Sequence, residues 1–326
     1  MRRIAKLLAL AGVILATPAT AQDDISAFLQ DGATDHGNIG IAAVRIVDGQ
    51  QEFGAIGPLQ QETATPITAD TIFEIGSISK IFTNLLLAQL VLESKMALDQ
   101  PARLYLPGDV TLPTFKGQEI TLFDLATHSA GLPPIPPEMI FADAENPYRV
   151  YSADMLFASL ENYQLFAAPG TRFSYSNIGA TLLGLAVAHV EGQPFETLVE
   201  QRILAPLGMS DTYLNVPEAE KVRFAAAHDA SGEPTSHWDF GVFAPAGGYR
   251  STAGDMAKFV AAASGQTQTP LTDAFALMLE QARPTDRPSM MVGLGWMISA
   301  KASVSGVCVC PLAAATNFAM SPAVER

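Results

Sequence analysis

A serine and a lysine three residues apart are the first side chains in this sequence that could carry chemistry. Ser77 and Lys80 end the segment 73–80 (FEIGSISK), and on a helix positions i and i+3 share one face. A serine hydroxyl needs a base within hydrogen-bond reach, and a lysine serves when burial lowers its pKa. A helix N-terminus also favours an oxyanion. By itself, the four-residue pattern occurs often by chance, and a helix cap followed by a surface lysine is then the better interpretation.

A tyrosine and an asparagine two residues apart form a second cluster. Tyr175 and Asn177 lie in the segment 173–177 (FSYSN), on a loop just before a predicted helix, where they would face the same way. Tyr175 supplies an acid/base phenol, and Asn177 supplies an amide that can donate to a substrate carbonyl and accept from the lysine. A core tyrosine and a helix-capping asparagine are the alternative interpretation.

Apolar periodicity predicts the helices that position these groups. From Ser77 to Lys95, apolar residues recur every three and four positions, which is typical of a buried amphipathic helix. The same reasoning predicts helices over 120–127, 152–163, 178–190, 194–203 and 254–263. Ser251 or Thr252 would cap the last of these helices. A Pro-rich loop at 132–137 is expected to form a wall over a cleft.

Strand-like runs lie near both ends of the sequence. Residues 39–47 and 52–56 flank an Asp-Gly-Gln turn and predict an antiparallel hairpin, and residues 291–299 return to strand-like sequence. We therefore expect an α+β fold, with an antiparallel sheet built from both termini and packed against a helical half. The crevice between two such halves is a common place for a small-molecule site.

Composition restricts the class of partner. The 326 residues carry 33 acidic and 19 basic side chains, a formal net charge of −14, with 48% hydrophobic residues. This balance favours a packed globular protein and argues against nucleic acid or an anionic membrane surface as partner. We expect a monomer that acts on a small-molecule substrate.

The N-terminus has the features of a secretory signal. Three basic residues precede the apolar run 7–16, and the sequence ATA at 19–21 resembles a cleavage site. The run is about half of the ~20 residues that span a bilayer. We predict cleavage after Ala21 and a periplasmic or secreted protein with no remaining membrane span.

Cysteine and histidine usage predicts neither a disulfide framework nor a metal site. The two cysteines, Cys308 and Cys310, lie one residue apart, and the five histidines lack metal-ligand spacing. We expect no metal and no cofactor.

With both clusters in view, the sequence resembles the serine β-lactamase and penicillin-binding protein family. It is most similar to the class C branch with its related esterases and D-aminopeptidases. Residues 73–80 resemble the class C active-site signature over their whole length, and Tyr-x-Asn at 175–177 lies where the second motif is expected. Further landmarks follow in the family's order at 98–99, 125–133, 169–170, 207–209 and 247–252.

The resemblance covers residues 25–298 and implies roles for the site residues. Ser77 would be the acylated nucleophile, Lys80 its proton acceptor, Tyr175 the phenol that shuttles protons and later activates water, and Asn177 a holder of the substrate amide. It implies a β-lactamase/transpeptidase-like domain over 22–300, with a sheet half (22–72 and 245–300) and a helical half (73–244). Residues 1–21 would be the signal peptide, and 301–326 an unassigned tail.

Two departures separate this sequence from the family pattern. No Lys-Thr-Gly or His-x-Gly triplet follows Trp296, so we expect the C-terminal strands to be incomplete. We hypothesise a shifted reading frame shortly after Gly295-Trp296, which the gene's other frames would test; a divergent but genuine C-terminus is the alternative. Ile135 also stands where class C β-lactamases usually offer a glutamine, which suits an ester at least as well as a β-lactam.

The resulting prediction is an exported serine hydrolase that cleaves a β-lactam amide through a Ser77 acyl-enzyme. A penicillin-binding DD-peptidase, an esterase of the same family and an inactive truncated remnant remain alternatives.

Overall fold

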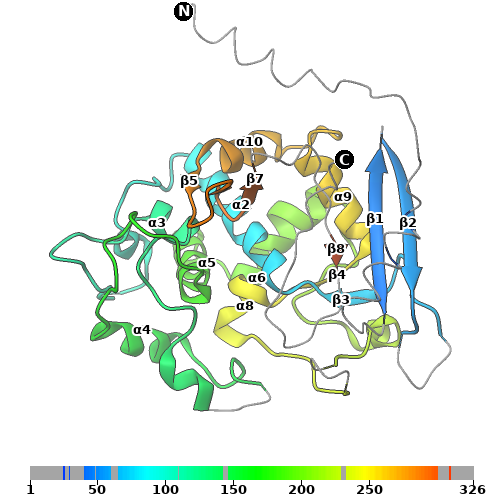
Figure 1. Ribbon diagram of the computed structural model, residues 1–326, viewed down its shortest axis with the longest axis horizontal. Helices are drawn as coiled ribbons and strands as arrows, with labels where there is room; N and C mark the ends of the chain where they lie inside the picture. The colour runs from blue at the N-terminus through cyan, green and yellow to red at the C-terminus, as the bar shows by residue number, and fades with distance from the viewer. Residues whose placement is uncertain are drawn as a thin grey trace, which may run out of the picture.

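The computed structural model describes residues 40–299, apart from 48, 60–64, 109, 142–145 and 229–232, together with residues 25, 29, 308 and 309. The predicted signal peptide and nearly all of the segment 301–326 lie outside these residues. Figure 1 shows a β-hairpin at one side of the molecule and a mass of helices at the other. This is the α+β arrangement that the sequence predicts.

The N-terminal hairpin consists of β1 (Ile41–Val47) and β2 (Gln50–Ile56). The strands pair antiparallel, with Ala43 opposite Gly54, and Gly49 at the turn has φ of +76°. On its other edge β1 pairs antiparallel with β8 (Cys308–Val309). Segments from the two ends of the chain therefore share one sheet, although the C-terminal partner is β8 rather than the strand expected over 291–299.

The remaining strands divide into two further antiparallel sheets within the described residues. β3 (Ile72–Glu74) pairs with β4 (Arg250–Thr252), and β5 (Arg283–Pro284), β6 (Met290–Val292) and β7 (Met297–Ser299) form the other sheet. The expected strand over 291–299 is a hairpin rather than one strand. Gly295 has φ of +76° and the Gly293 amide donates to the Trp296 carbonyl, which turns the chain between β6 and β7.

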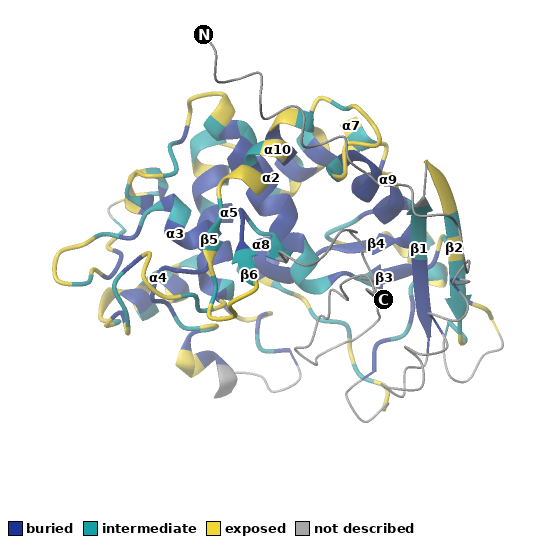
Figure 2. Cartoon of the chain, turned by 45° about the horizontal axis from the view of Figure 1, so that its top comes forward, coloured by how far each residue is buried: buried dark blue, intermediate teal, exposed yellow. Residues whose placement is uncertain are grey.

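Helix α2 (Ser79–Leu92) lies at the centre of the molecule. Eleven of its 14 residues are buried, so it is enclosed on nearly all sides rather than amphipathic. α5 (Asn177–Glu191) and the short α8 (Ala244–Gly247) pack against it. Figure 2 shows buried residues in these helices and in the strands and helices around them, including β3, β4 and α9 (Ala253–Ala263).

The other helical segments surround this centre. They are α3 (Leu122–Ala126), α4 (Ala153–Glu161), α6 (Phe195–Val199), α7 (Ala205–Leu207), α9 (Ala253–Ala263) and α10 (Thr272–Glu280), the 3₁₀ helices η1 (Gly76–Ile78), η2 (Ala102–Tyr105), η3 (Pro137–Phe141), η5 (Glu218–Arg223) and η6 (Gly241–Phe243), and the π-helix η4 (Glu200–Leu204). Within the described part of the chain, none of the helices combines the length and the apolar character needed to cross a bilayer.

Side-chain caps fix where several predicted helices begin. Thr121 forms a capping box with Asp124 before α3, Ser152 caps α4, Ser176 caps α5 and Thr252 caps α9. The prediction of a Thr252 cap is confirmed. Because Ser176 caps α5, Asn177 is free of the capping role that the alternative interpretation gave it.

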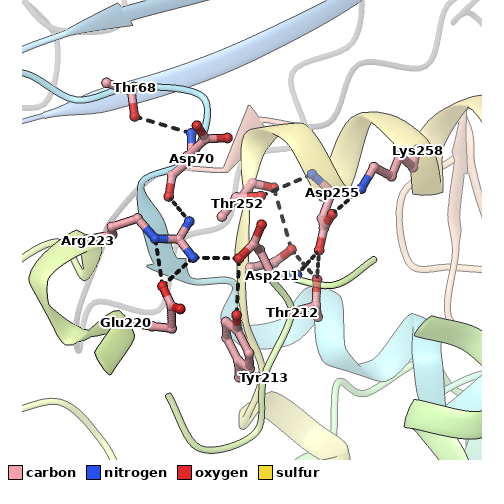
Figure 3. A network of polar contacts seen from close by, with 11 residues as sticks. Thr68, Asp70, Asp211, Thr212, Tyr213, Glu220, Arg223, Thr252, Asp255 and Lys258 are labelled. Carbon is pink, nitrogen blue, oxygen red and sulfur yellow. Dashed lines mark hydrogen bonds and ion pairs between the residues drawn. The ribbon is translucent and has the colours of Figure 1, made fainter. Parts of the chain in front are cut away.

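A polar network fastens the segment after α7 to β4 and α9 (Figure 3). Arg223 donates to Asp211 (2.5 Å), to Glu220 (2.6 Å) and to the Asp70 carbonyl (2.8 Å). The buried Asp255 accepts from the Asp211 amide (2.7 Å) and from the Thr212 hydroxyl (2.9 Å). These bonds brace the β3–β4 pair, and the chain leaves β3 directly toward Ser77.

Candidate active site

Ser77 lies at a sharp junction between a strand and a helix. The chain leaves β3, passes Gly76 with φ of +48°, and makes one 3₁₀ turn before α2 begins at Ser79. The Ile75 amide donates to the Tyr249 carbonyl (3.0 Å), and the Tyr249 amide donates to the Ser79 hydroxyl (3.1 Å). The backbone of Tyr249 therefore holds the chain on both sides of Ser77.

Three of the four residues singled out from the sequence meet at the Ser77 hydroxyl. Lys80 Nζ donates to Ser77 Oγ at 3.1 Å, and Tyr175 Oη lies 2.5 Å from the same oxygen. The first contact follows from the helical spacing of the pair. The second joins residues 98 positions apart, a contact that no local pattern determines.

Lys80 is buried, with only 3% of its surface exposed. Its Nζ also donates to the Ala246 carbonyl (2.6 Å) and lies 4.6 Å from the centre of the Tyr175 ring. Burial lowers the pKa of Lys80 to about 7, because a charged ammonium loses its hydration there. A substantial fraction of Lys80 is therefore neutral at physiological pH and can accept a proton.

The carbonyl that receives Lys80 comes from α8, which sequence reasoning did not connect with the site. Thr83 on α2 donates to the neighbouring Pro245 carbonyl (2.7 Å). At Gly184 of α5, a Cβ would come within 2.2 Å of the Pro245 ring. The missing side chain lets α8 approach α5 and puts Ala246 against Lys80. The sequence at 244–248 (APAGG) predicts a flexible turn, whereas residues 244–247 form α8 and make this contact.

Tyr175 is partly exposed, but its phenol pKa is strongly shifted. The residue is 40% exposed, yet desolvation of the phenol raises its pKa to about 12, against the opposing effect of the Ser77 hydrogen bond. Tyr175 therefore keeps its proton at neutral pH. Lys80 is the member of this group that can act as the base.

The chain on either side of Tyr175 is bonded to the loop that follows α3. The amides of Ser174 and Ser176 donate to the carbonyl (2.6 Å) and to Nδ1 (3.2 Å) of His128. The Ser176 hydroxyl donates to the Pro133 carbonyl (2.7 Å), and the Asn177 amide to the Pro134 carbonyl (2.9 Å). The loop 128–134 thus fixes the segment that presents Tyr175.

Asn177 occupies the first turn of α5, but it does not bind Lys80 as expected. Its side-chain Nδ2 donates to Tyr148 Oη (3.1 Å), and its Oδ1 is buried without a hydrogen-bond partner. Lys80 donates to the Ala246 carbonyl instead. The buried Oδ1 is an acceptor that a substrate N–H could satisfy.

Aromatic side chains extend from Tyr148 along one side of this region. Tyr148 stacks on Phe240 (4.8 Å between ring centres) and contacts Trp238 and Phe243. Ile135 of the Pro-rich loop is half-buried against the hydrophobic core.

No three His, Cys, Asp or Glu side chains in the described ranges lie close enough together to hold a metal ion. The described part of the site offers a hydroxyl, an amine, a phenol and an amide. These are the groups of nucleophilic acyl transfer.

Comparison with known protein families agrees with this chemistry. The family model described as Beta-lactamase matches residues 25–323, and so includes most of the segment 301–326. A Beta-lactamase of Pseudomonas fluorescens is 30% identical over 259 residues, covering 79% of this chain and 68% of that protein. The D-alanyl-D-alanine-carboxypeptidase/endopeptidase AmpH of Escherichia coli K12 is 30% identical over 257 residues, covering 77% and 65%. The chain thus spans about two thirds of the length of these relatives.

Solved structures show the same fold. A Beta-Lactamase/D-Alanine Carboxypeptidase from Pseudomonas syringae superposes with a TM-score of 0.72 at 27% identity, covering 84% of this chain and 73% of that one. A D-alanine Carboxypeptidase AmpC from Burkholderia cenocepacia gives 0.70 at 28% identity, covering 84% and 72%.

Proposed function

Because the chain belongs to the β-lactamase family, we propose that it is a serine hydrolase that opens a β-lactam amide through an acyl-enzyme on Ser77. The observation that carries the proposal is the contact of one hydroxyl with both a lysine amine and a tyrosine phenol. That hydroxyl has a base and a proton donor within reach before any substrate binds.

Acylation needs one proton to leave Ser77 and one to reach the departing nitrogen. Neutral Lys80 takes the Ser77 proton as Oγ attacks the carbonyl carbon, and a tetrahedral oxyanion forms. Collapse breaks the C–N bond, while Tyr175 gives its proton to the nitrogen and regains one from the Lys80 ammonium. Both residues return to their starting protonation states, and the ring-opened acyl group stays as an ester on Ser77.

In deacylation, Tyr175 and Lys80 carry a proton from water back to Ser77 Oγ. A water molecule attacks the ester carbonyl, and its proton reaches Tyr175 while the phenol proton passes to neutral Lys80. The ester bond then breaks and Lys80 returns the proton to Ser77 Oγ. Asn177, whose Oδ1 has no partner among the described residues, would accept an N–H from the acyl side chain and fix its orientation.

The oxyanion would rest on the Ser77 backbone amide, in the 3₁₀ turn before α2, where the helix end carries partial positive charge. The amides of Ile78 and Ser79 already donate within that turn. The sequence has no Lys-Thr-Gly or His-x-Gly triplet after Trp296, so the family's strand donor lacks its usual motif. Loss of one such donor costs about 100- to 1000-fold in rate. We therefore expect slower turnover than in a protein with both donors. If the rate falls far enough, the protein is in practice an inactive remnant.

A D-alanyl-D-alanine carboxypeptidase is the second candidate function. The similarity to the E. coli carboxypeptidase/endopeptidase and to the B. cenocepacia carboxypeptidase favours it. The two candidates share the acylation of Ser77 and differ in which ester water hydrolyses quickly, the β-lactam-derived ester or the peptidyl ester. The absence of a glutamine at Ile135 also keeps an esterase among the outcomes. The sequence at 1–21 supports export to the periplasm or beyond.

Hydrolysis of three substrates by one preparation separates these outcomes. We would measure opening of a chromogenic cephalosporin, release of D-alanine from a D-Ala-D-Ala peptide and cleavage of a p-nitrophenyl ester, each with wild type and Ser77→Ala. The proposal expects the β-lactam to be opened fastest and every activity to need Ser77. Faster D-alanine release would favour the peptidase, and ester cleavage alone the esterase. Activity retained in Ser77→Ala would contradict the Ser77 chemistry.

A further inference from the structure

The imidazole of His128 has an environment that the roles assigned so far do not use. His128 follows α3, is 7% exposed, and has a left-handed backbone with φ of +52°. A residue with a β-carbon adopts that conformation at a cost of about 1–2 kcal/mol. Such a position persists only where the surrounding contacts hold it.

Three contacts connect His128 with Tyr175 and both of its neighbours. The Ser174 amide donates to the His128 carbonyl (2.6 Å), and the Ser176 amide donates to Nδ1 (3.2 Å). The imidazole ring lies against the Tyr175 ring, with 4.7 Å between ring centres. Residues 174, 175 and 176 are thus each held by one histidine.

The Tyr175 phenol lies close to both Ser77 and Lys80. Its oxygen is 2.5 Å from Ser77 Oγ, and Lys80 Nζ is 4.6 Å from its ring centre. The residue is 40% exposed, so packing alone leaves much of its surface open to solvent. The contacts with His128 supply a restraint on the ring that burial does not.

We infer that His128 is the positioning residue of Tyr175, holding the phenol against Ser77 through its ring face, Nδ1 and carbonyl oxygen. It acts through Tyr175 and touches no reacting atom. This inference rests on the proposed function, in which Tyr175 moves a proton to the leaving nitrogen.

The protonation state of His128 fits this role. Burial, with a further contribution from the charge of Lys80, lowers the pKa of His128 to about 3. The ring is therefore neutral throughout the working pH range. Since Nδ1 accepts the Ser176 amide, the ring proton lies on Nε2. A positively charged imidazole would lose the Nδ1 acceptor and would repel the Lys80 ammonium.

Two substitutions separate the contributions of the ring and the acceptor. His128→Phe keeps an aromatic face and removes Nδ1, whereas His128→Asn suits the left-handed backbone and removes the ring. His189→Phe, the same change at an exposed position on α5, is the matched control. A misplacement of a reacting group by about 1 Å can cost about 100-fold in rate, and we expect at least a tenfold loss of acylation rate in both His128 variants.

The discriminating measurement repeats each substitution in a Tyr175→Phe background. If His128 acts by placing the phenol, its substitution slows acylation of the wild type but not of Tyr175→Phe, because no phenol remains to be placed. An equal loss in both backgrounds would mean a general structural role and would overturn the inference. So would an unchanged rate in both single variants.

A crystal structure of each folded variant supplies a readout independent of turnover. We expect the separation of Tyr175 Oη and Ser77 Oγ to lengthen relative to the wild type and to stay unchanged in His189→Phe. If the wild type forms no acyl-enzyme with any substrate, the proposed function fails, and this separation still decides the inference. An unmoved phenol in both His128 variants would refute it.

Discussion

Neutral Lys80 is the base in the proposed reaction, and its titration can be tested through activity. A group with a pKa of about 7 is about half neutral at pH 7 and about one-tenth neutral at pH 6. The acylation rate of Ser77 should therefore rise about tenfold per pH unit up to about pH 7 and level off above it. Stopped-flow acylation with a fluorescent penicillin between pH 5 and pH 9 measures this profile.

The same titration must affect folding, which gives a test that needs no substrate. In the unfolded chain Lys80 returns to an ordinary pKa near 10.5, so between pH 7 and pH 10.5 the unfolded state binds more protons than the folded state. Stability contributed by this group therefore rises with pH across that window. From pH 6 to pH 9 the gain in the free energy of unfolding is about 2–3 kcal/mol.

Lys80→Met is the matched variant, because it keeps an unbranched side chain of similar length and removes the titrating amine. It leaves the Ala246 carbonyl without its donor, at a cost of about 1–3 kcal/mol. That cost does not depend on pH. Urea unfolding at pH 6 and pH 9 should show the 2–3 kcal/mol difference in wild type only.

Two results would refute this reasoning. An acylation rate that stays constant from pH 5.5 to pH 8.5, or that rises only near pH 10, would mean that Lys80 keeps its proton at neutral pH and that another group is the base. An equal pH dependence of unfolding in wild type and Lys80→Met would mean that the amine is not desolvated in the folded state.

Three further substitutions test other parts of the structure. Tyr175→Phe should slow both acylation and deacylation by about 100- to 10,000-fold with little change in melting temperature; near-normal rates would remove the phenol from the proposed mechanism. Arg250→Met should lower the free energy of unfolding by about 3–5 kcal/mol, because the guanidinium donates to Glu74 (3.0 Å) and to the Gly248 carbonyl (2.7 Å). Urea unfolding measures this loss, and a loss below about 1 kcal/mol would show that these bonds do not stabilise the fold. Gly131→Ala should destabilise by more than about 1 kcal/mol, since Gly131 has φ of +74° and a Cβ would approach the Ala167 carbonyl to 2.5 Å; an unchanged melting temperature would show that the loop 128–134 adapts.

Local rules predicted those parts of the protein that depend on local geometry. The spacing of Ser77 and Lys80 follows from one helical turn, and Thr252 caps α9 because its hydroxyl reaches the Asp255 amide (3.1 Å). The N-terminal hairpin follows from its turn residues. In each case the interacting groups are within a few residues of one another, so the sequence pattern carries the contact.

Contacts between distant segments could not be derived in the same way. The Lys80–Ala246 bond depends on α8 reaching α2, and the Asn177–Tyr148 bond on a loop almost 30 residues away. The Asn177–Lys80 hydrogen bond that the sequence allowed is not formed, since Lys80 donates to Ser77 and Ala246. The pairing of Tyr175 with Ser77 was predicted only through the family resemblance, and the roles of these residues stay predictions.

His128 was interpreted only as one of five histidines without metal spacing. Its residue type gives no sign of the contacts with Tyr175, which join segments 48 positions apart. The available signal was its place within the landmark at 125–133, three residues before Gly131, whose φ is positive. In the region 291–299 the comparable signal is Gly295, whose positive φ divides a strand-like run into β6 and β7.

The central claim is that Ser77 forms a covalent acyl-enzyme, and intact mass spectrometry after exposure to a penicillin tests it most directly. Wild type and Ser77→Ala would be sampled over a time course, with peptide mapping of any adduct. We predict a mass increase equal to the whole penicillin in wild type, mapped to Ser77 and absent from Ser77→Ala. No adduct at any time from folded wild-type protein, or an adduct that persists in Ser77→Ala, would contradict the account.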